Sequence, residues 1–394
     1  MNDEVAGGRR GTGTWRRTAG RAALAVIAVL SLVLAMSAAF LYRQFNGNLH
    51  QVDVSGQLLE SAPPAPEVEG PHKPLNILIM ATDSRDCEGC QVDGLNGEGG
   101  SDTTILLHLS ADRKTAYGVS VPRDSMVDRP RCRDKKDPSI IHPAATTVMW
   151  NQAYAIGGVA CTEAQFMHNT GIPIDHYVEV NFGSFSTMVD ALGGVEVCVP
   201  QTWDDPKHGI HIAAGTRKIS GKPALAYVRE RYVVGNRSDT DRIKRQQAFI
   251  GAMVKQALSG GTLSNPARLY RFLDAATGSL TLDMNLASLA KLALQFKDIG
   301  ASGIQFITVP WEPPSWDKYR VVWSASAATL WQRILHDKPL SSAFTSEAIQ
   351  VDRLPGLSGT ASPSATPSGS PSGTASSSTQ EPNTSAALRR AGLC

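Results

Sequence analysis

The chain has 394 residues, of which 42% are hydrophobic and 19% charged, and its formal net charge is +2. A charge this close to neutral excludes a general electrostatic attraction to nucleic acid, so we expect no nucleic-acid partner. The length suffices for one large domain with further segments at its ends.

An apolar segment at residues 22–42 predicts a transmembrane helix, because about 20 apolar helical residues cross the roughly 30 Å hydrocarbon core of a bilayer. A cleaved signal peptide is the alternative, but its apolar region is usually shorter, about 7–15 residues. Basic residues before the segment outnumber those after it. We therefore expect a single-pass anchor in the cell membrane, with residues 1–21 in the cytoplasm and the rest outside. The preceding arginines are Arg9, Arg10, Arg16, Arg17 and Arg21, and only Arg43 follows directly.

Two segments flank the folded part. Residues 43–74 contain five prolines and are typical of a stalk that lifts the folded part off the membrane. Residues 341–394 form a Ser/Thr/Pro-rich tail that we expect to be disordered, because it buries too little apolar surface to offset its ordering entropy. Between them lie residues 75–258, the expected catalytic domain, and residues 259–340, its C-terminal extension.

The folded part alternates patterns of helix and strand. Apolar runs bounded by polar turns predict strands at 75–81, 103–109 and 115–121. Helices are predicted at 143–156, ending at a Gly-Gly pair, and at 159–169. A strand at 176–182, a helix at 185–192 and a strand at 195–199 follow, and Asp239 begins a helix that reaches about residue 258. Helices near 266–275 and 286–297 and a strand at 304–309 complete an α/β layered fold with a mixed sheet.

The cysteines lie in an exported chain, where disulfides persist. The CEGC motif at residues 87–90 lacks the second pair of ligands that a zinc site needs, so we expect a disulfide there. We predict a second disulfide between Cys132 and Cys161. Cys198 is expected to be a buried thiol, and Cys394 to be free or bound to the tail.

Charged residues gather where predicted elements end, which is where loops usually carry function. Aspartates at strand edges suit a hard cation such as Mg²⁺. Clustered arginines suit a phosphate ester, because guanidinium groups bind its oxygens in pairs. The clusters are residues 82–85 (TDSR), 99–102 (GGSD), 122–124 (PRD), and the set Arg229, Arg231, Arg242, Arg245, Gln246 and Gln247.

These clusters belong to an ordered series of motifs, among them NILIMATDSR, GGSDTTILLHL, YGVSVPRD, NQAYAIGG, ALAYVRERY and SDTDRIKRQQAF. The series resembles the LytR-CpsA-Psr family of cell-wall ligases over about residues 75–258, and the extension and tail resemble actinobacterial members. The resemblance implies a three-layer α-β-α sandwich with an apolar tunnel for a lipid. It also implies a Mg²⁺-dependent (or Mn²⁺-dependent) enzyme that transfers a glycopolymer from a polyprenyl-pyrophosphate carrier to a peptidoglycan sugar hydroxyl.

Carried over residue by residue, the resemblance assigns Asp83 and Asp102 to the metal. The expected catalytic residues are Asp83, Asp102, Arg123 and Asp124, with Asp83 and Asp124 as candidates for the general base. The expected pyrophosphate contacts are Arg85, Arg123, Arg229, Arg231, Arg242 and Gln246. Ala81 and Gly100 depart from the family's usual Gly and Arg, and the second change removes one possible phosphate contact.

One geometric expectation follows for the arginines. Arg242 and Gln246 are four apart and share a helical face. Arg229 and Arg231 share a face only if the backbone between them is extended. We therefore expect these four side chains to converge on one pocket near Asp83 and Asp102. The alternative is that they form surface ion pairs with Glu230, Asp239 and Asp241.

Other functions fit parts of the sequence. The same site could act as a polyprenyl-pyrophosphate pyrophosphatase, with water as the acceptor. A regulator of transcription is disfavoured because the 21 cytoplasmic residues are too few for a helix-turn-helix. A structural wall-binding protein is disfavoured by the Asp and Arg clusters. Trp311, Trp316 and Trp323 could form a platform for a sugar, although packing in a core or its rim is the more common fate of tryptophan.

Overall fold

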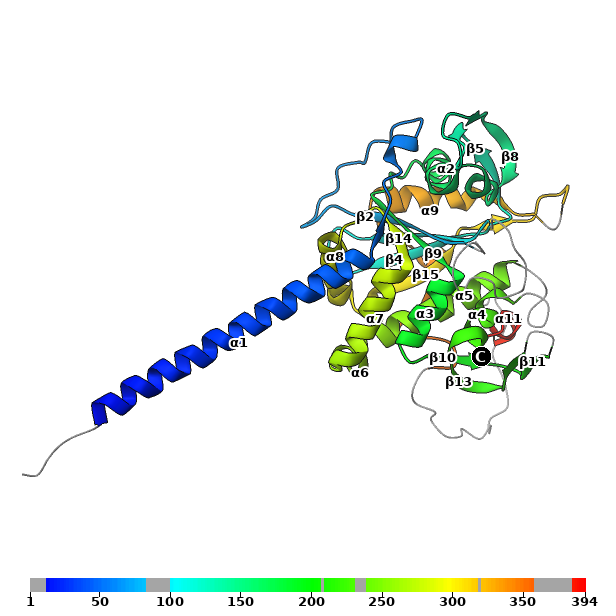
Figure 1. Ribbon diagram of the computed structural model, residues 1–394. Helices are drawn as coiled ribbons and strands as arrows, with labels where there is room; N and C mark the ends of the chain where they lie inside the picture. The colour runs from blue at the N-terminus through cyan, green and yellow to red at the C-terminus, as the bar shows by residue number, and fades with distance from the viewer. Residues whose placement is uncertain (1–11, 83–99, 207–208, 231–238, 318–319, 358–384) are drawn as a thin grey trace, which may run out of the picture. The chain divides into compact units, whose positions relative to one another are not determined.

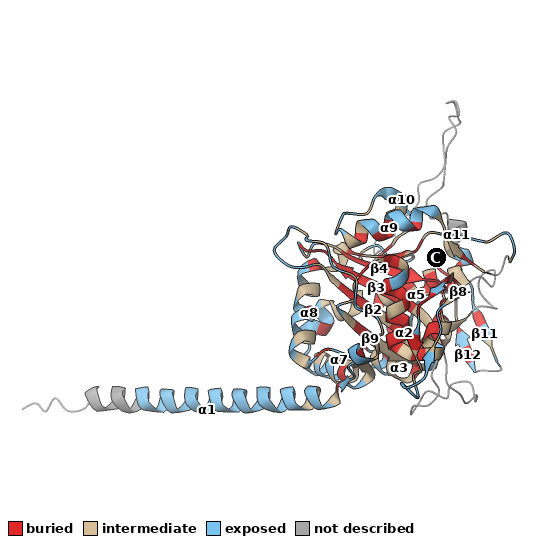
Figure 2. Cartoon of the chain, turned by 90° about the horizontal axis from the view of Figure 1, so that it is seen from above, coloured by how far each residue is buried: buried red, intermediate tan, exposed pale blue. Residues whose placement is uncertain are grey.

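The computed structural model describes residues 12–82, 100–206, 209–230, 239–317, 320–357 and 385–394. The chain divides into two units, Met1–Asn48 and Leu49–Cys394. The first contains helix α1 (Thr12–Asn48), whose segment Gly20–Asn48 is long and apolar enough to cross a membrane. None of this segment's apolar window is buried in the protein, as the exposed colouring of α1 in Figure 2 shows. The segment is a candidate membrane anchor, and it extends beyond the predicted 22–42.

An eight-stranded mixed sheet organises the second unit (Figure 1). Its central strand β2 is antiparallel to β3 and parallel to β9, while β4 is antiparallel to β3 and parallel to β15. This arrangement confirms the predicted mixed sheet. In spatial order the strands are β1 (His50–Gln51), β14 (Leu280–Leu282), β9 (His176–Asn181), β2 (Leu75–Thr82), β3 (Ser101–Leu109), β4 (Ala116–Val121), β15 (Ile304–Thr308) and β18 (Ile349–Gln350).

Helices cover both faces of the sheet, which confirms the three-layer α-β-α sandwich. Side chains alternate along the strands, so Ile77 and Leu107 join the core on one face, and Leu78 and Leu106 join the core on the other. Helices α2 (Gln152–Thr170) and α9 (Ala325–Leu335) lie on one face, above the sheet in Figure 1. The opposite face carries α3 (Phe182–Ala191), α4 (Gly221–Arg229), α5 (Asp239–Ala257), α7 (Pro266–Ser279) and α8 (Leu286–Ile299).

Strand direction determines which loops can meet. Strands β2, β9, β4 and β15 run the same way, so their carboxyl ends lie at one edge of the sheet. Strand β3 runs in the opposite direction and brings its amino end to that edge. Asp102 near the start of β3 and Arg123-Asp124 just after β4 are therefore neighbours in space although they are far apart in sequence.

Shorter elements surround this core. The hairpins pair β5 (Met126–Arg129) with β8 (Ala145–Met149), β6 (Cys132–Arg133) with β7 (Ile141–His142), and β10 (Val195–Val199) with β13 (Gly215–Ile219). Two further pairs are β11 (Trp203–Asp205) with β12 (Ile210–Ile212), and β16 (Trp311–Glu312) with β17 (Val322–Trp323). The remaining elements are the 3₁₀ turns η1 (Ser55–Gln57) and η2 (Ala301–Gly303), and helices α6 (Gly260–Leu263), α10 (Ser342–Thr345) and α11 (Ser385–Arg390).

The predicted helix at 143–156 is wrong in its first half. Residues 145–149 form β8, because the ATTVM segment is rich in β-branched residues that favour strands. The Gly-Gly pair does not end a helix but forms a kink inside α2. A Cβ at Gly157 would lie 2.6 Å from the Cβ of Cys161 and 2.5 Å from the carbonyl oxygen of Arg133, so only glycine fits at this close approach.

Two disulfides occur among the described residues. The predicted Cys132–Cys161 bond is confirmed and ties β6 to α2. The predictions for Cys198 and Cys394 are wrong, because these two residues form a disulfide between β10 and the C-terminus. Local pattern could not reveal this bond, since 196 residues separate its two ends. The cysteines of the CEGC motif lie outside the described residues.

The predicted stalk and tail are shorter than expected. His50–Gln51 joins the sheet as β1, and the buried Val54 packs into the core, so part of the expected stalk belongs to the domain. Ile349–Gln350 extends the sheet as β18, and Leu393 is buried near the end of the chain. Only residues 358–384 of the expected tail lie outside the description. Leu354 and Leu393, on either side of them, are buried in the domain.

Candidate active site

Two arginines and two aspartates meet at the sheet edge and form what we call the charged cluster: Asp102, Arg123, Asp239 and Arg242. The Nη1 of Arg123 donates a hydrogen bond to Oδ1 of Asp102, and its Nε lies 3.5 Å from Oδ1 of Asp239. The Nη2 of Arg242 donates to the same Asp239 oxygen and, at 3.3 Å, to the backbone carbonyl of Asp102. The cluster therefore joins β3, the loop after β4 and the first turn of α5.

Burial sets the electrostatics of the charged cluster. Arg242 is only 3% exposed, and burial lowers its pKa although Asp239 and Asp102 oppose the change. Burial likewise raises the pKa of Asp239, against the effect of Arg242 and Arg123. For Arg123, burial favours a lower pKa, but the nearby carboxylates of Asp102 and Asp239 outweigh it and raise the pKa. The charges thus compensate one another in a poorly solvated place.

Several polar atoms of the charged cluster are buried without a hydrogen-bond partner among the described residues. They are Nε of Arg123, Nε of Arg242 and Oδ2 of Asp239. Buried polar groups in proteins are nearly always paired, and unpaired ones call for a specific explanation. Two guanidinium N–H donors at one place suit an anion with several acceptor oxygens, such as a phosphate.

Asp124 lies beside the charged cluster. Its Oδ2 is 3.9 Å from Nε of Arg123, and its Oδ1 is 3.6 Å from Nη1 of Arg320. Burial is the main cause that raises the pKa of Asp124, and the negative charge of Asp239 adds to it. A carboxylate with a raised pKa is a stronger base than one in water, so Asp124 has the properties of a general base. Sequence reasoning did not find its partner Arg320, which lies in the C-terminal extension.

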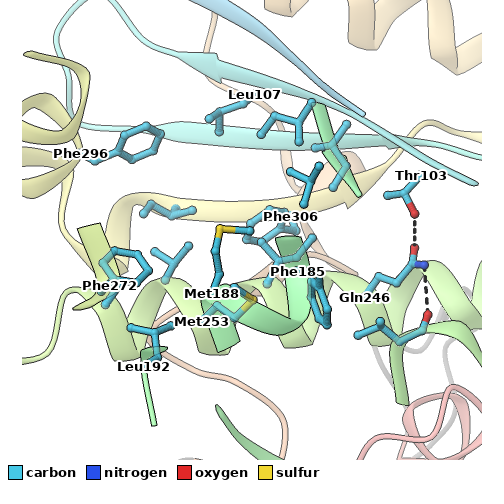
Figure 3. Close-up of a pocket in the computed structure, with 18 residues that line it drawn as sticks. Thr103, Leu107, Phe185, Met188, Leu192, Gln246, Met253, Phe272, Phe296 and Phe306 are labelled. Carbon is cyan, nitrogen blue, oxygen red and sulfur yellow. Dashed lines mark hydrogen bonds between the residues drawn. The ribbon is translucent and has the colours of Figure 1, made fainter. Parts of the chain in front are cut away.

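Gln246 connects the charged cluster to an apolar cavity. Its side-chain oxygen accepts a 3.2 Å hydrogen bond from Thr103, the neighbour of Asp102, and its Nε2 donates to the carbonyl of Val228 at 3.1 Å. Figure 3 shows Gln246 and Thr103 at one end of the cavity and Phe272 and Phe296 toward the other. Beyond these two polar residues, the lining is entirely hydrophobic.

The cavity has a volume of about 310 Å³ and lies between the sheet and the helices of the α3–α5 face. Strands β2, β3, β9 and β15 form its floor, and α3, α5, α7 and α8 supply most of its walls. Its lining comprises Ile79, Thr103, Ile105, Leu107, Val180, Phe185, Met188, Leu192, Val228, Gln246, Ile250, Met253, Val254, Ala257, Phe272, Phe296, Ile304 and Phe306. An apolar cavity with a charged head suits an amphiphilic ligand.

The expected convergence of arginines is found in part. Arg242 and Gln246 do share one face of α5 at the cluster. Arg229 ends α4, and its guanidinium stacks 4.1 Å from the ring centre of Phe182, just after β9. The backbone becomes extended at Glu230. An extended backbone between Arg229 and Arg231 was the condition predicted for these two side chains to share a face. Three expected site residues lie outside the described part of the chain: Asp83, Arg85 and Arg231.

Two members of the fourth sequence cluster have structural roles. Arg245, 1% exposed, donates hydrogen bonds to the carbonyls of Tyr227, Glu230 and Ala391. Gln247 donates to Oγ of Ser120 and the carbonyl of Ile307, which joins α5 to β4 and β15. Conversely, Asp239 was expected only as a helix cap or surface partner, yet its carboxylate bridges both arginines. Its position three residues before Arg242 was the available signal for that pairing.

The residues fit a hard divalent cation. Within the described ranges, no three His, Cys, Asp or Glu side chains are grouped to hold a metal ion by themselves. Asp102 nevertheless offers carboxylate oxygens, and Oδ2 of the nearby Asp239 has no hydrogen-bond partner in the described part of the chain. One or two carboxylates, with phosphate oxygens and water completing the shell, is the usual arrangement for Mg²⁺.

The described part of the chain thus forms an α-β-α sandwich with a charged cluster near the polar end of an apolar cavity. The LytR_cpsA_psr family model matches residues 42–334, and the chain belongs to this family. The cell wall biosynthesis protein LcpA of Corynebacterium glutamicum is 31% identical over 258 residues, 60% of this chain and 49% of that protein.

Two further comparisons agree. The polyisoprenyl-teichoic acid–peptidoglycan teichoic acid transferase TagU of Enterococcus faecalis is 30% identical over 225 residues, 57% of this chain and 66% of that protein. The chain thus spans about half to two thirds of the curated relatives named here. The solved LytR-Csp2A-Psr enzyme from Actinomyces oris has the same fold, with a TM-score of 0.52 and 22% identity over 71% of this chain and 96% of that one.

Proposed function

We propose that this protein is a membrane-anchored phosphotransferase that attaches a polyprenyl-pyrophosphate-linked glycopolymer to a peptidoglycan sugar hydroxyl, forming a phosphodiester in the cell envelope. One observation carries the proposal: the half-buried Arg123 and the buried Arg242 each have an Nε–H group without a hydrogen-bond partner among the described residues, and both lie near the polar end of an apolar cavity. The related TagU of Enterococcus faecalis is a polyisoprenyl-teichoic acid–peptidoglycan teichoic acid transferase, which supports the same class of substrate.

In this proposal the donor binds with its two chemically different parts in two different places. Arg123 and Arg242 bind the pyrophosphate oxygens through their guanidinium N–H groups. Gln246 and Thr103 mark the boundary, and the prenyl chain enters the cavity beyond them. Arg229 is held against Phe182 at the same sheet edge, and Arg85 and Arg231 are proposed as further phosphate contacts.

The chemistry is a displacement at phosphorus. The acceptor hydroxyl oxygen forms a bond to the phosphorus that carries the glycopolymer, and the bond from this phosphorus to the bridging oxygen breaks, which releases polyprenyl phosphate. Asp124 accepts the hydroxyl proton, since its raised pKa makes it a competent base. Arg123, which contacts both Asp102 and Asp239, stabilises the charge that accumulates on the phosphate oxygens.

A divalent cation, Mg²⁺ or Mn²⁺, is part of the proposal. Asp102 would hold it, together with Asp83. When bound, it neutralises phosphate charge and so favours attack by a hydroxyl. Asp102 would then have to share its carboxylate between the cation and Arg123, and Asp239, whose Oδ1 lies 3.5 Å from Nε of Arg123, would still balance the charge of that arginine.

The apolar segment Gly20–Asn48 would keep the domain at the surface where a lipid-linked donor resides. We propose the orientation predicted by the arginine asymmetry, with the N-terminus in the cytoplasm and the domain outside.

The test uses the full chain in detergent micelles with a polyprenyl-pyrophosphate-linked glycopolymer, with and without peptidoglycan. We expect the peptidoglycan-linked phosphodiester and free polyprenyl phosphate to form together, and to require Mg²⁺ or Mn²⁺. Arg242→Lys keeps a charge opposite Asp239 but loses the planar guanidinium, and should lower transfer by about 100-fold or more. Arg268→Lys, on the exposed face of α7, is the matched control and should transfer normally.

The outcomes separate the rival functions. Release of polyprenyl phosphate with no product on peptidoglycan would identify a pyrophosphatase and refute the transferase. Normal transfer by Arg242→Lys would refute the assigned role of the charged cluster.

A further inference from the structure

Two tryptophans on the β16–β17 hairpin are exposed to solvent. Trp316 is 59% exposed and Trp311 38%, whereas Trp150, Trp203 and Trp331 are at most 2% exposed. Indole is among the largest apolar groups, and a folded protein normally buries most of it. Two strongly exposed aromatic residues on one short hairpin are therefore a candidate binding surface.

The hairpin is attached directly to the loop after β4, which carries the proposed general base Asp124. Arg320 on the hairpin pairs with Asp124, and the backbone N–H of Val321 donates to the carbonyl of Asp124 at 3.4 Å. Met126 donates back to the carbonyl of Val321 at 2.8 Å, and Nε1 of Trp323 donates to Oγ of Ser125 at 3.3 Å. The position of the exposed tryptophans is thus linked to that of the proposed general base.

The base of the hairpin is anchored in the core, and the backbone between the two exposed tryptophans is restricted. Trp323 packs against Trp150 and Trp331 in the core, and it pairs with Trp311 across the hairpin. Pro313 and Pro314 restrict the backbone between the two exposed tryptophans. Asp317 donates its backbone N–H to the carbonyl of Pro314, and its carboxylate lies 3.7 Å from Nε of Arg320. A surface ordered in advance loses little entropy when it binds a ligand.

The chemistry of this surface fits a sugar. The face of an indole carries negative charge density and attracts the polarised C–H groups on the flat side of a pyranose ring. Glu312, Asp317 and Arg320 stand beside the tryptophans and offer donors and acceptors for hydroxyl groups. An exposed aromatic surface flanked by charged groups and next to a general base is what a glycan acceptor requires.

We propose that Trp311 and Trp316 form a stacking platform that binds the glycan strand of peptidoglycan and presents its hydroxyl to Asp124. This inference rests on the proposed function, since it identifies the acceptor subsite of the same reaction. It also gives a reason for the contacts between the C-terminal extension and the loop that carries Asp124. The extension would bind the acceptor glycan, while the cavity on the α3–α5 face would bind the lipid of the donor.

The test measures glycan binding and transfer separately, with the full chain in detergent micelles. The binding probe is a soluble peptidoglycan glycan strand freed of its peptides, titrated by calorimetry. We expect Trp316→Ala to weaken this binding at least tenfold and to raise KM for peptidoglycan by a similar factor, with KM for the donor unchanged. Trp316→Tyr should restore most of the binding. Leu294→Ala, at another exposed apolar residue (64% exposed) on α8, is the matched control.

Unchanged glycan binding and unchanged KM in both Trp316→Ala and Trp311→Ala would overturn the platform even if wild-type transfer is normal. Conversely, tryptophan-dependent glycan binding by a wild-type protein that makes no transfer product would support the platform and refute the proposed function. Tryptophans are also common at membrane interfaces. Quenching of Trp316 fluorescence by acyl-brominated phosphatidylglycerol, after reconstitution into vesicles of that lipid, would assign the surface to the bilayer and overturn the proposal.

Discussion

The C-terminal residues hold α4 and α5 together, and Cys394→Ser tests how much they contribute. The Cys198–Cys394 disulfide connects them to β10. Buried Arg245 donates to the carbonyl of Ala391 at 3.0 Å, and the Tyr227 hydroxyl donates to that of Gly392 at 3.1 Å. Since Arg245 also binds the carbonyls of Tyr227 and Glu230, the same side chain joins the end of the chain to the end of α4.

The magnitude follows from the length of the closed loop. For a sequence separation of 196 residues, the loss of loop-closure entropy in the unfolded chain corresponds to about 5 kcal/mol at 25 °C. For a unit the size of Leu49–Cys394, this lowers the melting temperature by about 7 °C. Deletion of residues 385–394 should lower it further. The deletion exposes the pocket of Leu393, worth about 2 kcal/mol, and removes an acceptor from buried Arg245, worth about 1–3 kcal/mol.

The assay is thermal unfolding of the full chain in detergent, followed by near-ultraviolet circular dichroism without reductant. Cys132→Ser is the matched control, because its 29-residue loop predicts a smaller loss of about 3.6 kcal/mol, or about 5 °C. A melting temperature unchanged by Cys394→Ser would refute the reasoning. So would peptide mapping that finds Cys198 and Cys394 as free thiols in the wild-type protein.

Three further predictions concern titration and topology. If Asp124 is the general base, its raised pKa should shift the acidic limb of the pH–rate profile for transfer to higher pH than an ordinary aspartate would give. Asp239→Asn should move that limb to lower pH, because the change removes a neighbouring negative charge. Burial raises the pKa of Glu163 on α2 from 4.5 to about 7, so the folded state holds this proton more tightly than the unfolded chain. The contribution of Glu163 to stability should therefore be largest below about pH 4.5 and fall by roughly 3 kcal/mol as the pH rises through 7. The difference in stability between pH 5 and pH 8, measured by urea unfolding, should accordingly change in Glu163→Gln by about that amount. A reporter enzyme that works only outside the cytoplasm should be active when it is fused after Cys394. Activity of a reporter that works only in the cytoplasm would contradict the proposed orientation.

Elements with strong local patterns were predictable from the sequence. Strands β2, β3 and β4 and helix α5 lie within about two residues of their predicted positions, because apolar periodicity and turn residues are local properties. The segment at 145–149 was mistaken for helix because a run of β-branched residues between a proline and a helix start has no periodicity of its own. The C-terminus was mistaken for tail because its anchoring depends on a disulfide partner and on Arg245, both remote in sequence.

The site shows the same division between local and remote information. The motifs identified Asp102, Arg123, Arg242 and Gln246, and the structure brings all of them to one sheet edge. Residue type alone placed Arg242 and Arg245, three residues apart on α5, in the same cluster, and only the family resemblance assigned Arg242 and not Arg245 to the phosphate. One meets carboxylates and the other meets backbone carbonyls, so their roles differ because of what packs against them rather than because of the helix that carries them.

The pairing of the charged cluster has a consequence for how a donor would bind. Two guanidinium groups held at one place repel each other, and burial removes the water that would screen them. Asp239 accepts from Arg242 and approaches Arg123, so it holds both cations in position before any phosphate arrives. If the proposed donor binds here, its phosphate oxygens would replace or share these carboxylate contacts, so binding would be an exchange of partners for the two arginines. Loss of Arg242 to alanine would leave Asp239 buried without its main partner and cost about 3–5 kcal/mol of stability. For this reason a charge-conserving replacement, not alanine, separates the catalytic role of Arg242 from its structural one.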